Sequence, residues 1–186
     1  MALPATEAFT GTGALSANWT TATGANAWDR VSDQAAPQSN TANHLSVWTA
    51  DTFNDDQYSQ YVLRDTDLRH GPAVRCATGA VTCYLVTCSD GQLYSLVAGS
   101  YTALGAAFGA FANGDTAKLT VSGTTLELFK NGVSQGTRTS SAISSGSAAL
   151  YGYYNTARAD DWEGGNLGGG AATTRPAYHF TLLGVQ

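Results

Sequence analysis

Two carboxylates at alternating positions are the residues of this sequence that are best spaced for chemistry. Asp161 and Glu163, in the stretch ADDWEGG, would share one face of a β-strand, because alternate side chains of a strand point to the same side. Glycoside hydrolysis uses such a pair, with one carboxyl group as the acid and the other as the nucleophile. No third carboxylate continues the alternation, and glycines follow at once. We therefore interpret the segment as the end of a strand and predict no catalytic residues and no enzymatic activity.

Two other chemical motifs fail because of their context. Residues 132–136, GVSQG, match the G-x-S-x-G pattern of a hydrolase elbow, but that elbow joins a strand to a helix, and here the pattern follows a hairpin turn. His44, His70 and His179 lack metal-type spacing, and the cysteines lack a C-x-x-C pair. The sequence therefore predicts neither a serine hydrolase nor a zinc site.

Acidic loops are the remaining candidates for a metal, since calcium binds oxygen ligands that loops supply. The run DTFNDD at residues 51–56 and the pair Asp160 and Asp161 could supply such ligands. Asp and Asn also bond to their own backbone in turns, which explains both runs without a metal. We predict no required cofactor and keep calcium as the alternative at these loops.

The three cysteines leave two interpretations open. Cys83 and Cys88 are too far apart to bridge if they lie on one extended strand, whereas a hairpin around residues 78–80 would place Cys76 opposite Cys83. The latter pair would form a cross-strand disulfide in an oxidising compartment and would remain buried thiols in a reducing one.

Aromatic side chains are the candidates for ligand binding, because Trp and Tyr rings present a large apolar face together with a polar tip. Such a ring can stack on a sugar while nearby polar groups bond to its hydroxyls. We predict glycan contacts for Trp48, Tyr151, Tyr153 and Trp162. In the stretch YGYYN, Tyr151 and Tyr153 would share one face of a strand. The alternative is that these rings belong to the core of the domain.

The composition of the 186-residue chain fits one all-β domain with a weakly charged surface. Charged residues make up 12% of the chain, against about 25% in typical domains, which suits neutral partners or copies of the same chain. A net charge of -5 and only two lysines argue against a nucleic-acid partner. The first residues show no signal-peptide pattern, and no apolar run could span a membrane, so we expect no membrane partner and folding in a cytoplasm.

Short strands joined by tight turns predict an antiparallel β-sandwich, a jelly roll or a barrel. The clearest hairpin is GDTAKLTVSGTTLELFKNG, in which a two-residue loop at residues 122–123 would pair Leu119 with Leu126 inside and Lys118 with Glu127 outside. A slip by one residue would bury the charges, so the faces of this hairpin are well specified.

The same pattern continues along the chain. Asn131 and Gly132 would form the next turn, since both tolerate positive φ, and the poorly alternating run after them is typical of an edge strand. Other short runs rich in Val, Leu, Thr and Tyr begin at residues 56, 71, 82, 91 and 147.

The composition changes near the end of the chain. We divide the chain into a β-sandwich at residues 1–166 and an extension at residues 167–186, in which a glycine-rich linker precedes one more strand, AYHFTLLGVQ. That strand could close the domain's own sheet or add to a sheet edge on a neighbouring subunit.

Three stretches carry a family resemblance: DTFNDDQYSQYVLR, GDTAKLTVSGTTLELFKNGV and ALYGYYNTARADDWEGGN. In order and spacing they are similar to a concanavalin A-like lectin/glucanase domain of the laminin G-like kind, over residues 9–166. The resemblance implies a two-sheet jelly roll whose closing strand, DDWEGG, pairs near the N-terminus. The glucanase members carry a Glu-x-Asp-x-x-Glu catalytic strand that this sequence lacks, so the resemblance implies a non-catalytic role.

Domains of this kind occur in bacteriophage virion proteins and in carbohydrate-binding proteins. We predict a structural component of the phage virion surface, either a capsid decoration or a tail or fibre protein, made in the host cytoplasm. Its expected partners are other virion proteins or copies of itself in a homo-oligomer, with cell-surface glycans as further partners. The alternative is a carbohydrate-binding module or lectin, with or without calcium.

Overall fold

The computed structural model describes residues 3–41, 43–65 and 67–168. Within these ranges the chain forms strands and turns but no helix, and accordingly no helix there could cross a membrane. The predicted terminal strand lies outside the described residues, so its pairing stays a prediction.

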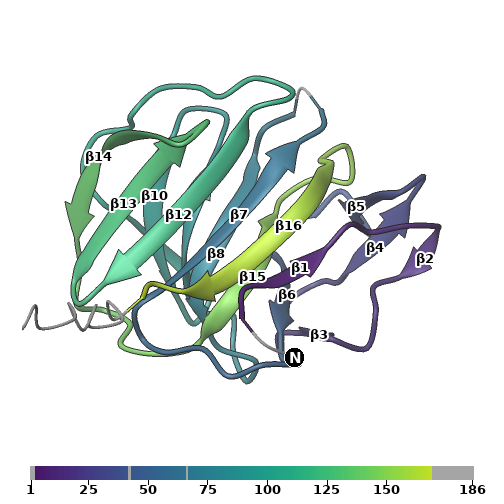
Figure 1. Cartoon of the computed structure of the whole chain (residues 1–186), viewed down its shortest axis with the longest axis horizontal. Helices are drawn as coiled ribbons and strands as arrows, with labels where there is room; N and C mark the ends of the chain where they lie inside the picture. The colour runs from purple at the N-terminus through teal and green to yellow at the C-terminus, as the bar shows by residue number, and fades with distance from the viewer. Residues whose placement is uncertain (1–2, 42, 66, 169–186) are drawn as a thin grey trace, which may run out of the picture.

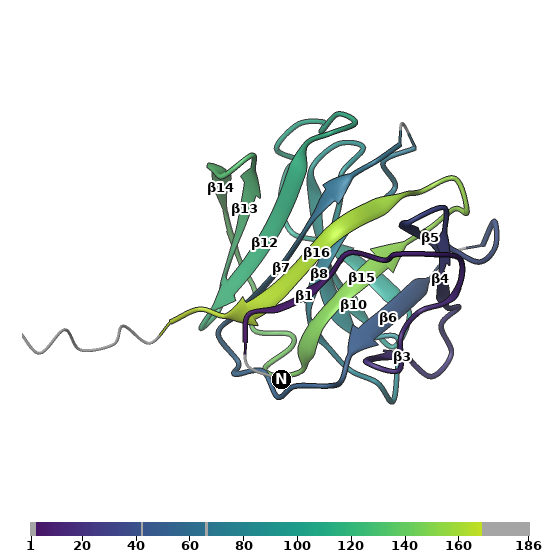
Figure 2. The ribbon, with the colours of Figure 1, turned by 45° about the vertical axis from the view of Figure 1, so that its right-hand side comes forward.

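The described strands form two antiparallel sheets that pack face to face (Figures 1 and 2), which confirms the predicted β-sandwich. The nine-stranded sheet contains β1 (Ala5–Glu7), β2 (Gly13–Ala14), β4 (Trp28–Val31), β5 (Gln34–Pro37), β7 (Gln57–Leu63), β12 (Thr116–Ser122), β13 (Thr125–Lys130), β14 (Val133–Thr139) and β16 (Ala159–Asn166). The seven-stranded sheet contains β3 (Trp19–Thr21), β6 (His44–Trp48), β8 (His70–Cys76), β9 (Cys83–Thr87), β10 (Gln92–Val97), β11 (Ser100–Ala103) and β15 (Ser147–Gly152).

Strands from distant parts of the chain lie side by side, as in a jelly roll. The nine-stranded sheet has the order β14-β13-β12-β7-β16-β5-β4-β2, with β1 paired to β16, and the seven-stranded sheet has the order β11-β10-β9-β8-β15-β6-β3. Ala5 of β1 lies opposite Gly164 of β16. The implied pairing of the closing strand near the N-terminus is therefore confirmed.

The core between the sheets is built by alternation along the strands. In β7 every second residue is buried, including Tyr61 and Leu63, while the residues between them are only partly buried. Three tryptophans, Trp19, Trp48 and Trp162, pack on one another with ring centroids 4.6 to 5.1 Å apart. These rings supply a large part of the apolar area that stabilises the sandwich.

The hairpin of β12 and β13 has the predicted faces but a different register. Leu119 lies opposite Leu128 rather than Leu126, and Thr120, not Lys118, lies opposite Glu127. The predicted pairing is therefore wrong by two residues, because the two-residue loop is Gly123-Thr124 instead of Ser122-Gly123. A shift by an even number keeps each side chain on its side of the sheet, so the apolar residues still face the core.

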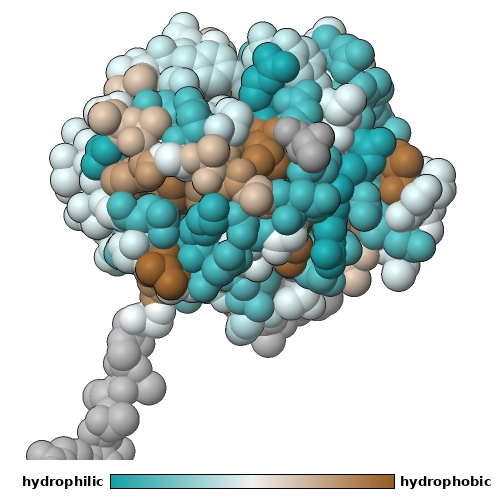
Figure 3. Space-filling view, turned by 90° about the horizontal axis from the view of Figure 1, so that it is seen from above, coloured by the Kyte–Doolittle hydropathy of each residue, from teal (hydrophilic) through white to brown (hydrophobic). Residues whose placement is uncertain are grey.

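The next turn agrees with the prediction. Asn131 and Gly132 join β13 to β14 with φ values of 51° and 78°, which a two-residue hairpin loop of the primed type requires. β14 is the edge strand of its sheet, and Val133 at its start is 65% exposed. Seen from above, the molecule is covered mainly by hydrophilic and weakly hydrophobic residues, and brown atoms lie in several separate places (Figure 3).

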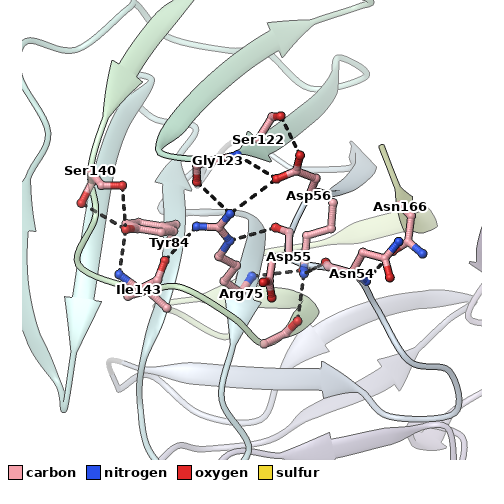
Figure 4. A network of polar contacts seen from close by, with 12 residues as sticks. Asn54, Asp55, Asp56, Arg75, Tyr84, Ser122, Gly123, Ser140, Ile143 and Asn166 are labelled. Atoms are coloured by element: carbon pink, nitrogen blue, oxygen red, sulfur yellow. Dashed lines mark hydrogen bonds and ion pairs between the residues drawn. The ribbon is translucent and has the colours of Figure 1, made fainter. Parts of the chain in front are cut away.

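A buried arginine ties three loops together at one end of the sandwich (Figure 4). Arg75, at the end of β8, is 4% exposed. Its guanidinium donates to the backbone carbonyls of Asp55, Ile143 and Gly123 at 2.8 to 2.9 Å. The Asp56 carboxylate lies 3.7 Å from the same group. Most of this charge is thus satisfied by backbone oxygens, which fixes the positions of the loops.

All three cysteines are buried free thiols. Burial and a hydrogen bond with Cys83 raise the pKa of the Cys76 thiol, so the hairpin does bring these two side chains together. Burial also raises the pKa of the Cys88 thiol. The structure therefore agrees with the interpretation as buried thiols.

Candidate functional site

The outer face of the seven-stranded sheet, which points away from the other sheet, carries a small apolar cluster of its own. Alternate residues of neighbouring strands belong to it, among them Ala73, Leu85, Leu96 and Tyr151. Both faces of β8 are consequently buried along its whole length. Loops fold over this face, since the Thr23 N–H donates to the carbonyl of Thr78 at 2.8 Å.

Strong curvature of the seven-stranded sheet brings Tyr101 and Tyr151 together. Tyr101 lies on β11 and Tyr151 on β15, four places away in the strand order, which is about 19 Å in a flat sheet. Their ring centroids are only 6.4 Å apart, and their hydroxyl oxygens are 2.5 Å apart. The outer face must therefore curl into a concave surface.

Four tyrosines surround a hollow of about 450 Å³ on this concave surface, which we call the tyrosine hollow. This volume lies within the range of small-molecule binding sites. Its lining is Arg69, Thr87, Ser89, Asp90, Tyr94, Tyr101, Tyr151 and Tyr153. The residues come from β9, β10, β11, β15 and the loops beside them, so the sheet holds the rings in place.

Hydrogen bonds fix the base of the hollow. Tyr101 donates to Oδ1 of Asn43 and therefore accepts the hydroxyl proton of Tyr151. Burial raises the pKa of Tyr151, so its hydroxyl stays protonated at neutral pH. Asp90 is also held, because one of its oxygens accepts from the Thr87 hydroxyl and the Gln92 N–H.

Other polar tips remain free for a ligand. Within the described residues, the hydroxyls of Tyr94, Tyr153 and Ser89 make no hydrogen bond to the protein. All three residues line the hollow, and four of its eight lining residues are tyrosines. An apolar surface with a few convergent hydroxyl groups is typical of a site for a polyhydroxylated ligand.

An arginine stacked on tyrosines forms one side of the hollow. The guanidinium carbon of Arg69 lies 4.0 Å from the ring centroid of Tyr154 and 5.9 Å from that of Tyr153. It also donates to the Tyr154 hydroxyl at 3.1 Å and pairs with Asp67 at 3.3 Å. These contacts orient the Tyr153 ring at the rim.

The structure separates the four predicted binding residues into two groups. Tyr151 and Tyr153 both line the tyrosine hollow. Trp48 and Trp162 are each 1% exposed and stack on each other inside the core, with centroids 5.0 Å apart. The prediction that these two tryptophans stack on a glycan is therefore wrong, because neither ring has a free face.

Sequence reasoning missed Tyr94, Tyr101 and Arg69. A signal for the two tyrosines exists in the hairpin QLYSLVAGSYTA, whose two-residue turn at Ala98-Gly99 puts Tyr101 opposite Leu96. Tyr94 and Leu96 share a face, so both tyrosines lie on one side of the hairpin. The position of Arg69 depends on a loop conformation that the sequence does not reveal.

The paired carboxylates lie on the outer face of the other sheet. Asp161 and Glu163 line a separate hollow with Glu7, and both lie within β16, so the interpretation of this segment as a strand end is wrong. A bulge interrupts the strand there. Asp161 pairs with Arg64 at 3.4 Å, and Glu163 accepts the Tyr58 hydroxyl at 2.5 Å.

The candidate calcium loops form no common site. Within the described residues, no group of three or more His, Cys, Asp or Glu side chains is placed to hold a metal ion. Asp56 accepts from the Ser122 hydroxyl and the Gly123 N–H, and Asp160 pairs with Arg64 at 3.3 Å. Asp56 and Asp160 thus have protein partners of the kind that turns and surface ion pairs supply.

Comparison with known proteins identifies the architecture. No family model and no curated protein matches the sequence. Among solved structures, the carbohydrate binding module CBM66 from Bacillus subtilis matches with a TM-score of 0.58 at 16% identity, over 78% of this chain and 95% of that one. These matches show the fold.

Two further structures with the same architecture are described as enzymes that act on carbohydrates. A putative glycosyl hydrolase from Parabacteroides distasonis has a TM-score of 0.56 at 9% identity, covering 81% of this chain and 89% of that chain. The Bacillus licheniformis beta-glucanase has a TM-score of 0.52 at 11% identity, covering 89% and 98%. The concanavalin A-like jelly roll is therefore shared by binding modules and hydrolases, and function must be argued from the site.

Proposed function

We propose that this protein is a carbohydrate-binding module and that the tyrosine hollow is its binding site. The observation that carries the proposal is the convergence of four tyrosine rings on one hollow of the concave sheet. A carbohydrate-binding module with the same fold supports it. The ligand class follows from the lining. Tyr94, Tyr101 and Tyr153 expose ring surface for stacking, whereas Tyr151 is buried. The hydroxyls of Tyr94 and Tyr153 have no partner among the described residues and can bond to a sugar.

The charges around the hollow favour a neutral sugar. Arg69 and Asp90 are the charged residues of the lining, and their formal charges cancel. Asp67 pairs with Arg69, so little net attraction remains for an ionised ligand. Binding therefore depends on stacking and hydrogen bonds, and we expect it to need no calcium.

Replacing Tyr153 by alanine tests the site. We expect the glycan affinity of Tyr153→Ala to fall about tenfold, or about 1.4 kcal/mol, because a stacking face and a free hydroxyl disappear together. Tyr153 is only partly buried, so the melting temperature should stay within a few degrees of the wild type. Titration calorimetry and thermal unfolding measure the two effects.

Val133→Ala provides the matched control. This residue is exposed on β14, far along the other sheet, so its removal should change neither quantity. Equal affinities of Tyr153→Ala and the wild type would place the binding site elsewhere.

A role on a phage virion surface is our second proposal, and it is compatible with glycan binding. Its support is the open edge of β14, which offers unpaired backbone groups to a strand from another copy or another virion protein. In this proposal the protein is made in the host cytoplasm and assembles on a capsid or tail.

Deletion of residues 171–186 tests assembly. We expect the truncated chain to keep its melting temperature and to lose self-association in sedimentation experiments, because the predicted terminal strand would no longer reach a neighbouring edge. A truncated chain that associates as the full chain does would remove this role for the extension. Loss of folding would instead show that the strand completes the domain's own sheet.

A further inference from the structure

Tyr101 closes one side of the tyrosine hollow. Its ring packs edge-on against Tyr94 and Tyr151, with centroids 5.7 and 6.4 Å away. Its hydroxyl bonds to both Asn43 and Tyr151. Asn43 directly precedes β6, whereas Tyr101 lies on the edge strand β11. These contacts therefore form a bridge across the concave face.

A second hollow lies beyond this bridge. It has a volume of about 380 Å³, and we call it the glycine hollow. Its lining is Thr23, Gly24, Asn43, Gly79, Ala80, Val81, Ala98 and Gly99. Asn43 lines the glycine hollow and Tyr101 lines the tyrosine hollow, so the hydrogen bond between these side chains joins the two linings.

A ligand in the tyrosine hollow could open this bridge only at a cost in free energy. A ligand that continued from one hollow into the other would have to displace the Tyr101 hydroxyl from Asn43 and Tyr151. Tyr151 is 1% exposed, and its hydroxyl would lose the bond to Tyr101 in a partly buried position. Arg69, stacked on Tyr153 and Tyr154, bounds the hollow on another side.

We infer that Tyr101 determines specificity by giving the tyrosine hollow a closed end, so that the site accepts the terminal sugar of a glycan and rejects a chain that continues past that sugar. This inference rests on the proposed function of the hollow as a sugar site. Unlike that proposal, it specifies which part of a neutral glycan is recognised.

An array of linear oligosaccharides tests the inference on the full chain. The array presents neutral hexoses (glucose, galactose, mannose and fructose), each as a terminal unit and as an internal unit capped by a different sugar. For the wild type we expect every bound glycan to share a terminal unit, and capping that unit should reduce binding at least about tenfold.

Tyr101→Ala should relax this selectivity. Removal of the bridge joins the tyrosine hollow to the glycine hollow, so capped glycans should bind and the preference for the terminal unit should fall about tenfold. The matched control is Val97→Ala on the neighbouring strand, whose side chain is 44% exposed and does not line either hollow. Thermal unfolding of each variant shows that the domain is intact.

The possible outcomes distinguish the sugar site from the closed end that Tyr101 forms. Equal wild-type binding to terminal and internal units would overturn the closed end and leave the sugar site standing. If Tyr101→Ala is folded, binds the uncapped glycans and keeps the full terminal preference, Tyr101 is not the barrier, and the inference is wrong. No wild-type binding to any sugar on the array would contradict the proposed function and the inference with it.

Discussion

Trp162→Ala lowers the free energy of unfolding by about 3–5 kcal/mol. The indole ring is 1% exposed, lies 4.6 Å from the Trp19 ring centroid and 5.0 Å from that of Trp48, and donates from Nε1 to the Ser59 hydroxyl at 3.0 Å. Alanine would leave a cavity among these rings and a buried hydroxyl without its donor. Stability of a domain totals about 5–15 kcal/mol, so the loss is a large fraction of it.

Chemical denaturation and thermal unfolding of Trp162→Ala beside Tyr153→Ala measure this effect. Both changes remove an aromatic ring, but only the first removes it from the core. We expect the melting temperature of Trp162→Ala to fall by about 10 °C and that of Tyr153→Ala by far less. Similar losses for the two variants would contradict the assignment of Trp162 to the core.

Arg75→Met is expected to destabilise the domain by about 3 kcal/mol or more. Methionine fills much of the space but leaves the carbonyls of Asp55, Gly123 and Ile143 without their donors. The same end of the sandwich also makes stability depend on pH.

The Gly123 N–H and the Ser122 hydroxyl donate to the Asp56 carboxylate and hold the pKa of that carboxyl below its usual value. Because the pKa of Asp56 is lower in the folded than in the unfolded chain, these bonds stabilise the fold at neutral pH, and their contribution is lost as the pH falls through the lowered pKa.

Arg64→Met is the matched control for Arg75→Met. Arg64 also pairs with carboxylates, Asp160 at 3.3 Å and Asp161 at 3.4 Å, but its side chain is 38% exposed. Surface pairs of this kind contribute about 0–1 kcal/mol, so this variant should unfold nearly as the wild type does. The same loss in both variants would show that the buried carbonyl contacts of Arg75 add nothing.

The parts of the fold that were predictable are those encoded locally. Alternation placed Leu119 and Leu128 on the buried face, and Asn131-Gly132 marked its turn through the need for positive φ. The turn alone did not determine the register of the same hairpin. Two overlapping dipeptides, Ser122-Gly123 and Gly123-Thr124, could each form the loop, and both keep the apolar side chains inside.

The sequence predicted only part of the binding site, because residues from distant strands meet there. Tyr151 and Tyr153 were found because they stand two residues apart in the sequence, although β15 ends at Gly152 and Tyr153 follows it outside the strand. Trp48 was misassigned because a tryptophan looks the same in the sequence whether it packs on Trp162 or faces a ligand. The local hairpin pattern places Tyr101 beside Tyr94, but the approach of Tyr101 to Tyr151 depends on the curvature of the whole sheet, which no local pattern encodes.

The most direct test of the carbohydrate-binding site is an array of glycans probed with the wild type and with Tyr94→Ala/Tyr153→Ala. Both residues line the tyrosine hollow, and their hydroxyls have no hydrogen-bond partner among residues 3–41, 43–65 and 67–168. We expect the wild type to bind with calcium and with chelator alike, and the double variant to lose binding while remaining folded. Wild-type protein that binds no glycan, or a double variant that binds as strongly as the wild type, would contradict the proposed site.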